Sequence, residues 1–172
     1  PAADSVPAMI AARAVCVVAG PAGRREVPVE AICTGPGTTS LKPGEFVLEI
    51  RLPSRPKKAA DAYLRLIPRT EMDIAVAGAA VSLALGADDT VTEAHVALGA
   101  VAPTALLVAE AGQALVGSKL DEAALAKLDA AARAACRPIS DKRGTAEYRT
   151  KIAGVLARRA ALIAYQRAKE RA

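Results

Sequence analysis

The sequence has few of the residue types on which enzyme active sites and nucleic-acid surfaces are commonly built. Its 172 residues include no tryptophan, one phenylalanine, three tyrosines and a single histidine, His95. No second histidine is present, which excludes most zinc-enzyme and hydrolase sites. His95 lies on a predicted strand with Glu93 on the same face, and a lone strand histidine is more often structural than catalytic.

Cysteine patterns typical of metal sites or secreted proteins are also missing. Cys16, Cys33 and Cys136 are odd in number and lack metal-ligand spacing, which is typical of reduced thiols in a cytoplasmic protein. Without a nearby base, Cys33 is expected to be a small buried thiol rather than a nucleophile. The longest uncharged run, residues 74–87, is too short to span a bilayer, so we expect no membrane insertion.

The charge distribution and the apolar composition indicate which partners and which kind of core to expect. The net charge of +5 is spread out, and the densest basic pairs, Lys57-Lys58 and Arg158-Arg159, have no aromatic residues between them. A nucleic-acid partner is therefore not expected, because such surfaces combine a basic stripe with stacking rings. Alanine and valine carry much of the 52% apolar fraction. They predict a core of small side chains, as where helices lie closely on a sheet.

The first 53 residues predict a small, mainly antiparallel unit. The chain opens on Pro1-Ala2-Ala3-Asp4, with neither an initiating methionine nor a signal peptide, and we expect a piece of a longer polypeptide. Apolar alternation and turn residues predict a helix over 6–12, a hairpin of strands 14–19 and 24–29, a helical turn at 29–32, a loop at 34–39 and a strand over 45–52. Residues 54–61 are expected to be a linker.

Residues 62–172 predict strands followed by helices, which is an α+β architecture. Strands at 62–67, 73–85 and 90–98 form a three-stranded antiparallel meander. Three helices follow, at 107–115, at 121–134 with Asp121 near its N-cap, and from Thr145 towards the C-terminus. One stripe of the last helix is expected to face inward, formed by Tyr148, Ile152, Val155, Leu156, Leu162 and Ile163.

Three loops contain enough glycine or charged residues to be considered as ligand-binding sites. The turns Gly20-Pro21-Ala22-Gly23 and Gly35-Pro36-Gly37 lack a Gly-x-Gly-x-x-Gly pattern, and proline removes an amide donor, so neither predicts a phosphate cradle. The segment from Arg69 to Ile74 has two interpretations, and the sequence alone favours neither of them. It is either a polar hairpin loop with an Arg69–Asp73 ion pair, or a loop that a rigid sheet presents to a ligand or partner.

The most distinctive motif is Pro138-Ile-Ser-Asp-Lys-Arg-Gly-Thr-Ala-Glu-Tyr-Arg149, at the start of the last predicted helix. It resembles the C-terminal signature of the FAD-binding (medium) subunit of molybdenum hydroxylases, the group of carbon monoxide dehydrogenase and xanthine dehydrogenase. Segments 41–53, 63–74 and 97–104 carry the same resemblance, which covers nearly the whole chain. The resemblance implies part of a second FAD-binding subdomain at 1–53, a linker at 54–61 and, at 62–172, the C-terminal domain of the medium subunit.

The resemblance also implies three cofactor-binding positions and no catalytic or metal-binding residue. Asp4 matches an acidic residue that contacts FAD, and Val47 matches an apolar position against the flavin. Arg65 matches a basic position near the isoalloxazine, where a positive charge would favour a reduced, anionic flavin. The family's glycine-rich fingerprints lie in an N-terminal subdomain that this chain does not contain, so the FAD site here is incomplete. At Gly37 many relatives carry an aromatic residue that can cover the ring.

The function implied by the resemblance is electron transfer in an oxidoreductase complex. Electrons would pass from [2Fe-2S] clusters in a small subunit to FAD, and then to an external acceptor. A large subunit would carry the molybdenum cofactor, giving a hetero-oligomer. The cofactors carry the redox chemistry and the polypeptide positions them. A non-catalytic assembly or docking module stays open as the alternative, whereas a small-molecule-binding domain without redox function has no supporting motif.

Overall fold

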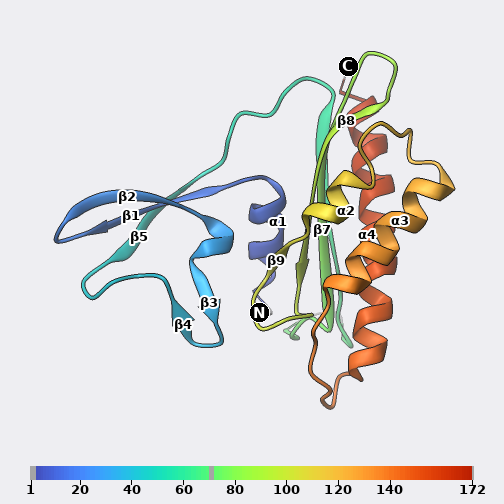
Figure 1. The fold of residues 1–172 in the computed structure, drawn as a ribbon. Helices are drawn as coiled ribbons and strands as arrows, with labels where there is room; N and C mark the ends of the chain where they lie inside the picture. Colours follow the sequence, from blue (N-terminus) through green and yellow to red (C-terminus); the bar gives the residue numbers. More distant parts are fainter. Residues whose placement is uncertain (1–2, 70–71, 172) are drawn as a thin grey trace.

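The computed structural model describes residues 3–69 and 72–171, and its centre is a four-stranded antiparallel sheet. The strand order is β6 (Ala59–Leu66), β7 (Ala77–Leu85), β8 (Val91–Gly99) and β9 (Leu106–Leu107). Helices α2 (Ala109–Gln113), α3 (Glu122–Ala135) and α4 (Ala146–Lys169) lie on one side of this sheet, and α1 (Ser5–Ala11) lies on the other (Figure 1). The predicted α+β class and antiparallel meander are confirmed, with β9 added at the edge.

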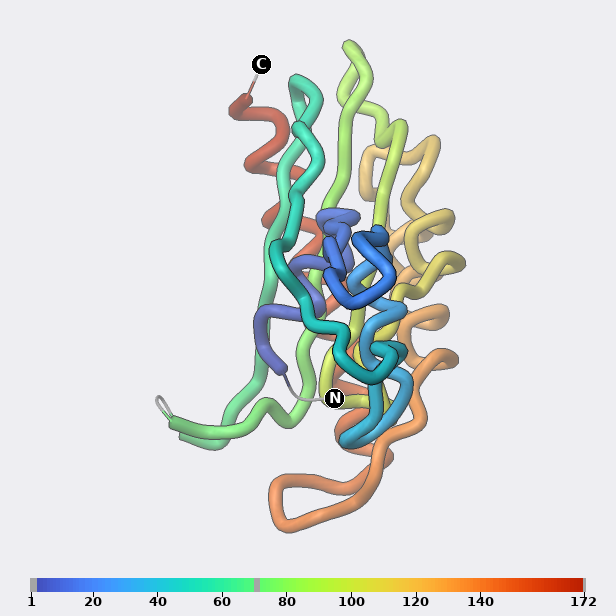
Figure 2. The backbone as a smooth tube through the Cα atoms, turned by 90° about the vertical axis from the view of Figure 1, so that its left-hand side faces the viewer, coloured from blue at the N-terminus to red at the C-terminus, as the bar shows by residue number. Residues whose placement is uncertain are grey.

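The N-terminal unit lies on the α1 side of the main sheet (Figures 1 and 2). Its sheet has the order β2 (Gly23–Pro28), β1 (Val15–Gly20) and β5 (Phe46–Arg51), so the predicted hairpin and final strand are confirmed. The predicted helical turn is present as η1 (Val29–Ala31). The prediction of a plain loop at 34–39 was wrong, because β3 (Cys33–Gly35) and β4 (Thr38–Thr39) pair as a small ladder.

Small side chains build the main core, as the composition indicates. Helix α4 packs on β6 and β7 through alanines that are almost completely buried: Ala153, Ala157, Ala160, Ala161, Ala164 and Ala168. The predicted inward stripe was only partly right: Leu156 is buried, and Ile152 and Ile163 pack on the core, but Tyr148 is 45% exposed and Leu162 is 47% exposed. Alanines let the helix backbone approach the sheet closely, and that contact decides which face turns inward.

Several element boundaries differ from the predicted ones. Strand β6 begins at Ala59, inside the expected linker, and β7 begins at Ala77 rather than at residue 73. Residues 73–76 instead lead the chain back to the sheet, where the Val76 N–H donates to the Leu66 carbonyl at 2.8 Å. The first expected helix starts at Ala109, because Leu106–Leu107 extend the sheet as β9.

The two N-caps that the sequence predicts are present. Asp121 Oδ1 accepts from the Ala124 N–H at 2.8 Å, and Thr145 Oγ1 accepts from the Tyr148 N–H at 3.1 Å. Each cap satisfies a backbone donor that the first helical turn leaves without an intrahelical partner. Among residues 3–69 and 72–171, no helix is long and apolar enough to cross a membrane.

Candidate functional site

Asp4 and Arg65 meet where the start of α1 approaches the end of β6. Asp4 is the N-cap residue of α1, but its side chain accepts no capping hydrogen bond. Its Oδ2 instead forms an ion pair with the Arg65 guanidinium. Its Oδ1 is buried and accepts no hydrogen bond within the described residues. A buried carboxylate oxygen normally has a hydrogen-bond donor, so Asp4 Oδ1 is left as an unsatisfied acceptor.

Tyr63 lies beside this pair, two residues before Arg65 and on the same face of β6. Its hydroxyl lies over Gly78 of β7, where an added Cβ would come within 2.8 Å of the oxygen. Burial, and after it the negative charge of Asp4, raises the pKa of Tyr63 to about 12. The phenol is therefore neutral at physiological pH. Sequence reasoning did not select Tyr63, although its spacing from Arg65 places both side chains on one face.

Two facing glycines shape the sheet beneath these side chains. Gly78 of β7 is paired with Gly99 of β8. A Cβ at Gly99 would approach Pro7 of α1 to 2.6 Å, as one at Gly78 would approach Tyr63. Because neither glycine has a side chain, Tyr63 and Pro7 can pack directly against the backbone of the sheet at this point. This packing fixes the start of α1, and with it Asp4, against β6.

The third predicted site residue lies in a different sheet. Val47 is on β5, opposite Val18 of β1, and its half-buried side chain packs against the core between α1 and the N-terminal sheet. The structure therefore brings Asp4 and Arg65 into direct contact, while Val47 lies in the neighbouring unit. Gly37 lies between β3 and β4 with φ of +72°, and a Cβ there would meet nothing within 4 Å.

The chain between β6 and β7 carries the expected ion pair. Arg69 Nε lies 3.1 Å from Asp73 Oδ2, and the Asp73 side chain is 7% exposed whereas that of Arg69 is 72% exposed. Burial alone would raise the pKa of Asp73, but hydrogen bonds from Arg69 and from the Ile74 N–H outweigh it and lower the pKa. The two interpretations of this loop remain predictions, and its residues 70–71 lie outside the described part of the chain.

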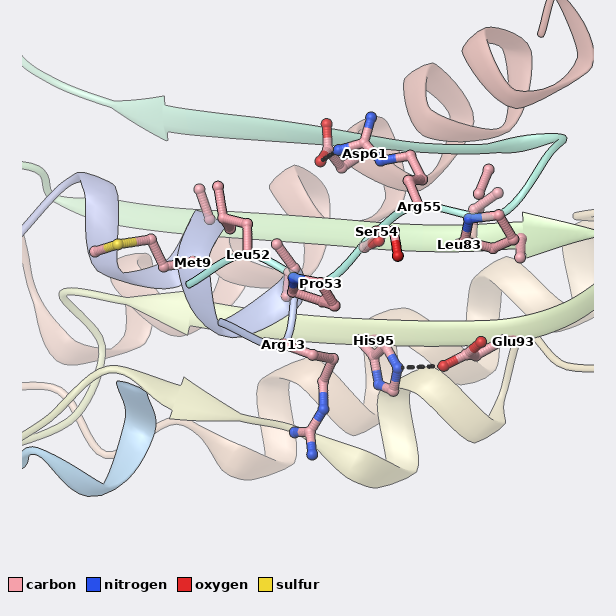
Figure 3. Close-up of a pocket in the computed structure, with 17 residues that line it drawn as sticks. Met9, Arg13, Leu52, Pro53, Ser54, Arg55, Asp61, Leu83, Glu93 and His95 are labelled. Carbon is pink, nitrogen blue, oxygen red and sulfur yellow. Dashed lines mark hydrogen bonds and ion pairs between the residues drawn. The ribbon is translucent and has the colours of Figure 1, made fainter. Parts of the chain in front are cut away.

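A cavity of about 500 Å³ lies on the α1 side of the main sheet, towards the end away from Asp4 and Arg65 (Figure 3). The end of α1, the connection 52–56 and the faces of β6, β7 and β8 enclose it. His95 Nε2 lies 2.8 Å from Glu93 Oε1 at its edge, as the shared strand face predicts. Arg55 is likewise paired with Asp61. Each of these polar side chains has its partner within its own pair, and the contact with Glu93 fits a structural role for His95.

The cysteines give one correction. Cys16 and Cys136 are buried as expected, but Cys33 is exposed. It lies at the start of the short β3–β4 ladder, which packs less of its surface than a core strand does. Burial raises the pKa of the Cys136 thiol to about 11. Within the described residues, no group of three or more histidine, cysteine or acidic side chains is placed to hold a metal ion.

Comparison with known proteins decides the family. Residues 62–164 match the family of the CO dehydrogenase flavoprotein C-terminal domain, and residues 1–55 match the FAD binding domain in molybdopterin dehydrogenase. The chain belongs to the medium, FAD-binding subunit family of molybdenum hydroxylases. It contains part of the FAD domain followed by the C-terminal domain.

Individual relatives agree with this assignment. The chain is 45% identical over 150 residues to the carbon monoxide dehydrogenase medium chain of Afipia carboxidovorans, covering 87% of this chain and 51% of that one. It is 37% identical over 158 residues to the medium chain of Hydrogenophaga pseudoflava, covering 92% and 54%. The structure of reconstituted CO dehydrogenase from Oligotropha carboxidovorans superposes with a TM-score of 0.89 at 41% identity, over 98% of this chain and 57% of that one. The chain thus spans about half the length of these relatives.

The side chains at the start of α1 fit the cofactor of this family. The buried Asp4 Oδ1 is an unsatisfied acceptor, and the donor it lacks would be a hydroxyl or an N–H group, both of which FAD carries. Arg65 places a cation beside it and Tyr63 a neutral phenol. FAD, when bound, supplies the electron-transfer chemistry, while the protein sets its position and electrostatic surroundings.

Proposed function

We propose that this chain is part of the flavin-carrying subunit of a molybdenum-dependent hydroxylase or dehydrogenase. The subunit passes electrons from [2Fe-2S] clusters through FAD to an external acceptor. The observation that carries the proposal is the Asp4–Arg65 pair, with its unsatisfied Asp4 oxygen, in a chain that belongs to the medium-subunit family. Asp4, Arg65 and Val47 are the proposed FAD contacts. The pyrophosphate would be held by glycine-rich segments outside this chain.

The ion pair changes the electrostatic effect that Arg65 alone would have. A guanidinium near the isoalloxazine attracts negative charge, whereas the Asp4 carboxylate in contact with Arg65 opposes that attraction. The two side chains therefore act on the flavin with opposite sign. Tyr63 adds a neutral hydroxyl, because its pKa of about 12 keeps it protonated. In this proposal the chain orients the ring and sets its potential without a catalytic acid or base.

The proposal includes the partners and the organisation of the complex. A large subunit would bind the molybdenum cofactor and a small subunit the [2Fe-2S] clusters, in a cytoplasmic hetero-oligomer. The chain would divide into FAD-domain residues 1–53, connection 54–61 and C-terminal domain 62–172. The early start of β6 at Ala59 ties the last part of this connection to the main sheet.

One observation favours a second candidate, a non-catalytic assembly or docking module. Strand β5 is an edge strand of the N-terminal sheet, and four large apolar side chains on it or directly after it are exposed: Phe46, Leu48, Ile50 and Leu52. Edge strands with apolar surface are places where another chain or domain packs. Under the flavoprotein proposal the same surface packs against the rest of the FAD domain or a partner subunit.

The visible absorption spectrum and metal content of the complete protein, purified gently from its native source, test the proposal. A flavin band together with co-eluting iron and molybdenum is the expected result. A colourless, metal-free protein that elutes alone would contradict the redox role and leave the assembly module as the better account.

A further inference from the structure

Arg149 is buried where neither burial nor helix electrostatics favours a cation. Among residues 3–69 and 72–171 it is the only charged residue that is buried as a whole, with 4% of its surface exposed. It lies in the first turn of α4, although the N-terminal end of a helix disfavours positive charge. Burying a guanidinium is costly even when it is paired, so a gain in stability alone does not account for Arg149.

The contacts of Arg149 join two separate stretches of chain. We call residues 137–145 the signature connector and residues 73–76 the return segment. Arg149 Nη2 donates to Asp141 Oδ1 in the signature connector at 2.6 Å, and Nη1 donates to the Val76 carbonyl in the return segment at 2.8 Å. The Val76 N–H in turn donates to the Leu66 carbonyl at 2.8 Å. Leu66 follows Arg65 directly. The Arg149 guanidinium is therefore linked, through Val76, to the end of β6 that carries the proposed flavin contact Arg65.

A second link holds the other end of the return segment. The Asp141 carboxylate accepts from the Arg143 N–H at 2.8 Å, and this hydrogen bond closes a turn within the signature connector. Arg143 Nε lies 3.7 Å from Asp73 Oδ1, the oxygen that also accepts from the Ile74 N–H. Figures 1 and 2 show the connector and the β6–β7 connection at the same end of the sheet as the start of α1. The return segment is therefore held at Asp73 and at Val76 from one connector.

We infer that Arg149 and Asp141 are positioning residues for the flavin site. They clamp the return segment, and this clamp fixes where the β6–β7 ladder ends and how Arg65 is presented beside Asp4. The inference rests on the proposed function, which it extends to residues that lie away from the proposed FAD contacts. It also gives the signature motif a physical role, because Asp141, Arg143 and Arg149 all belong to that motif.

FAD binding to the complete, deflavinated protein tests this inference, measured by titration with FAD and followed by flavin fluorescence. The variants are Arg149→Met, Arg149→Lys and Asp141→Asn, with Arg65→Met as the direct-contact reference. Arg158→Met is the charge-matched control, since Arg158 is on the same helix but pairs with Glu122 on α3. Leu128→Ala is the control for lost stability, because Leu128 is completely buried and lies on α3, outside the return segment and the signature connector. Thermal unfolding of each variant is measured in parallel.

We expect Arg149→Met and Asp141→Asn to raise the FAD dissociation constant by about 2- to 30-fold, the range for side chains that act on a ligand site without touching it. Arg149→Lys should restore part of the affinity, while both control variants bind FAD like the wild type. The inference is overturned if Arg149→Met weakens binding no more than Leu128→Ala does while Arg65→Met weakens it clearly. If Arg65→Met binds FAD normally, the proposed flavin placement itself fails and the inference falls with it.

Discussion

Replacing Gly78 by alanine tests the packing that sets the candidate site. The new Cβ would lie 2.8 Å from the Tyr63 hydroxyl oxygen and 3.2 Å from its Cε2, both closer than ordinary contact, so the ring must move. Overpacking of this kind costs about 1–3 kcal/mol. Replacing a strand glycine by alanine recovers about 0.5–1 kcal/mol of backbone entropy. The net expectation is a loss of about 0–2.5 kcal/mol in the free energy of unfolding.

The sign of this effect should depend on Tyr63. In a Tyr63→Val background the ring is gone, so Gly78→Ala should become neutral or stabilising by up to about 1 kcal/mol. Gly99→Ala is the matched control, since its Cβ would meet Pro7 at 2.6 Å and the loss of Tyr63 does not relieve that contact. Urea unfolding of the four members of the cycle gives the coupling energy. Equal costs of Gly78→Ala in both backgrounds, with a coupling below about 0.5 kcal/mol, would refute the reasoning.

Three further predictions concern acid stability, thiol reactivity and the core. Hydrogen bonds from Arg25 and from the Lys42 N–H lower the pKa of Glu45 from its usual 4.5 to about 2. Its stabilising contribution should therefore be complete above about pH 4.5 and disappear as the pH falls towards 2, and Glu45→Gln should remove this part of the pH dependence of urea unfolding. Iodoacetamide at pH 8 should modify the exposed Cys33 first and the buried Cys136, with its pKa of about 11, only after unfolding; equal rates by mass spectrometry would contradict the burial. Leu128→Ala should cost about 2–5 kcal/mol of unfolding free energy, because Leu128 is completely buried, and a cost below about 1 kcal/mol would contradict its place in the core.

Local signals in the sequence predicted the element types well. Asp121 and Thr145 act within their own first helical turn, so their role depends only on neighbouring residues. The β1–β2 hairpin follows in the same way from an apolar strand, a glycine turn and a return strand in which polar and apolar residues alternate. The inward face of α4 could not be predicted locally, because large apolar residues and alanines compete for it. The close approach of α4 to β6 and β7 settles that competition in favour of Ala157 and Ala161.

The candidate site was only partly predictable. Asp4 and Arg65 came from the family resemblance, and nothing in their sequence separation indicates that they form an ion pair. Tyr63 was missed because its surroundings depend on the register that places Gly78 opposite Arg65. Arg149 has the sequence pattern of a solvated helix residue, and its burial follows from non-local contacts with Val76 and Asp141.

The central claim is that the Asp4–Arg65 pair faces the flavin, and the flavin midpoint potential of the complete protein tests it most directly. Potentials are compared for the wild type, Arg65→Met and Asp4→Asn. Loss of the cation should lower the potential and loss of the anion should raise it, each by tens of millivolts, since about 30 mV corresponds to about 1.4 kcal/mol for a two-electron couple. Shifts of opposite sign are the predicted result. Unchanged potentials in both variants, or shifts in the same direction, would contradict the account.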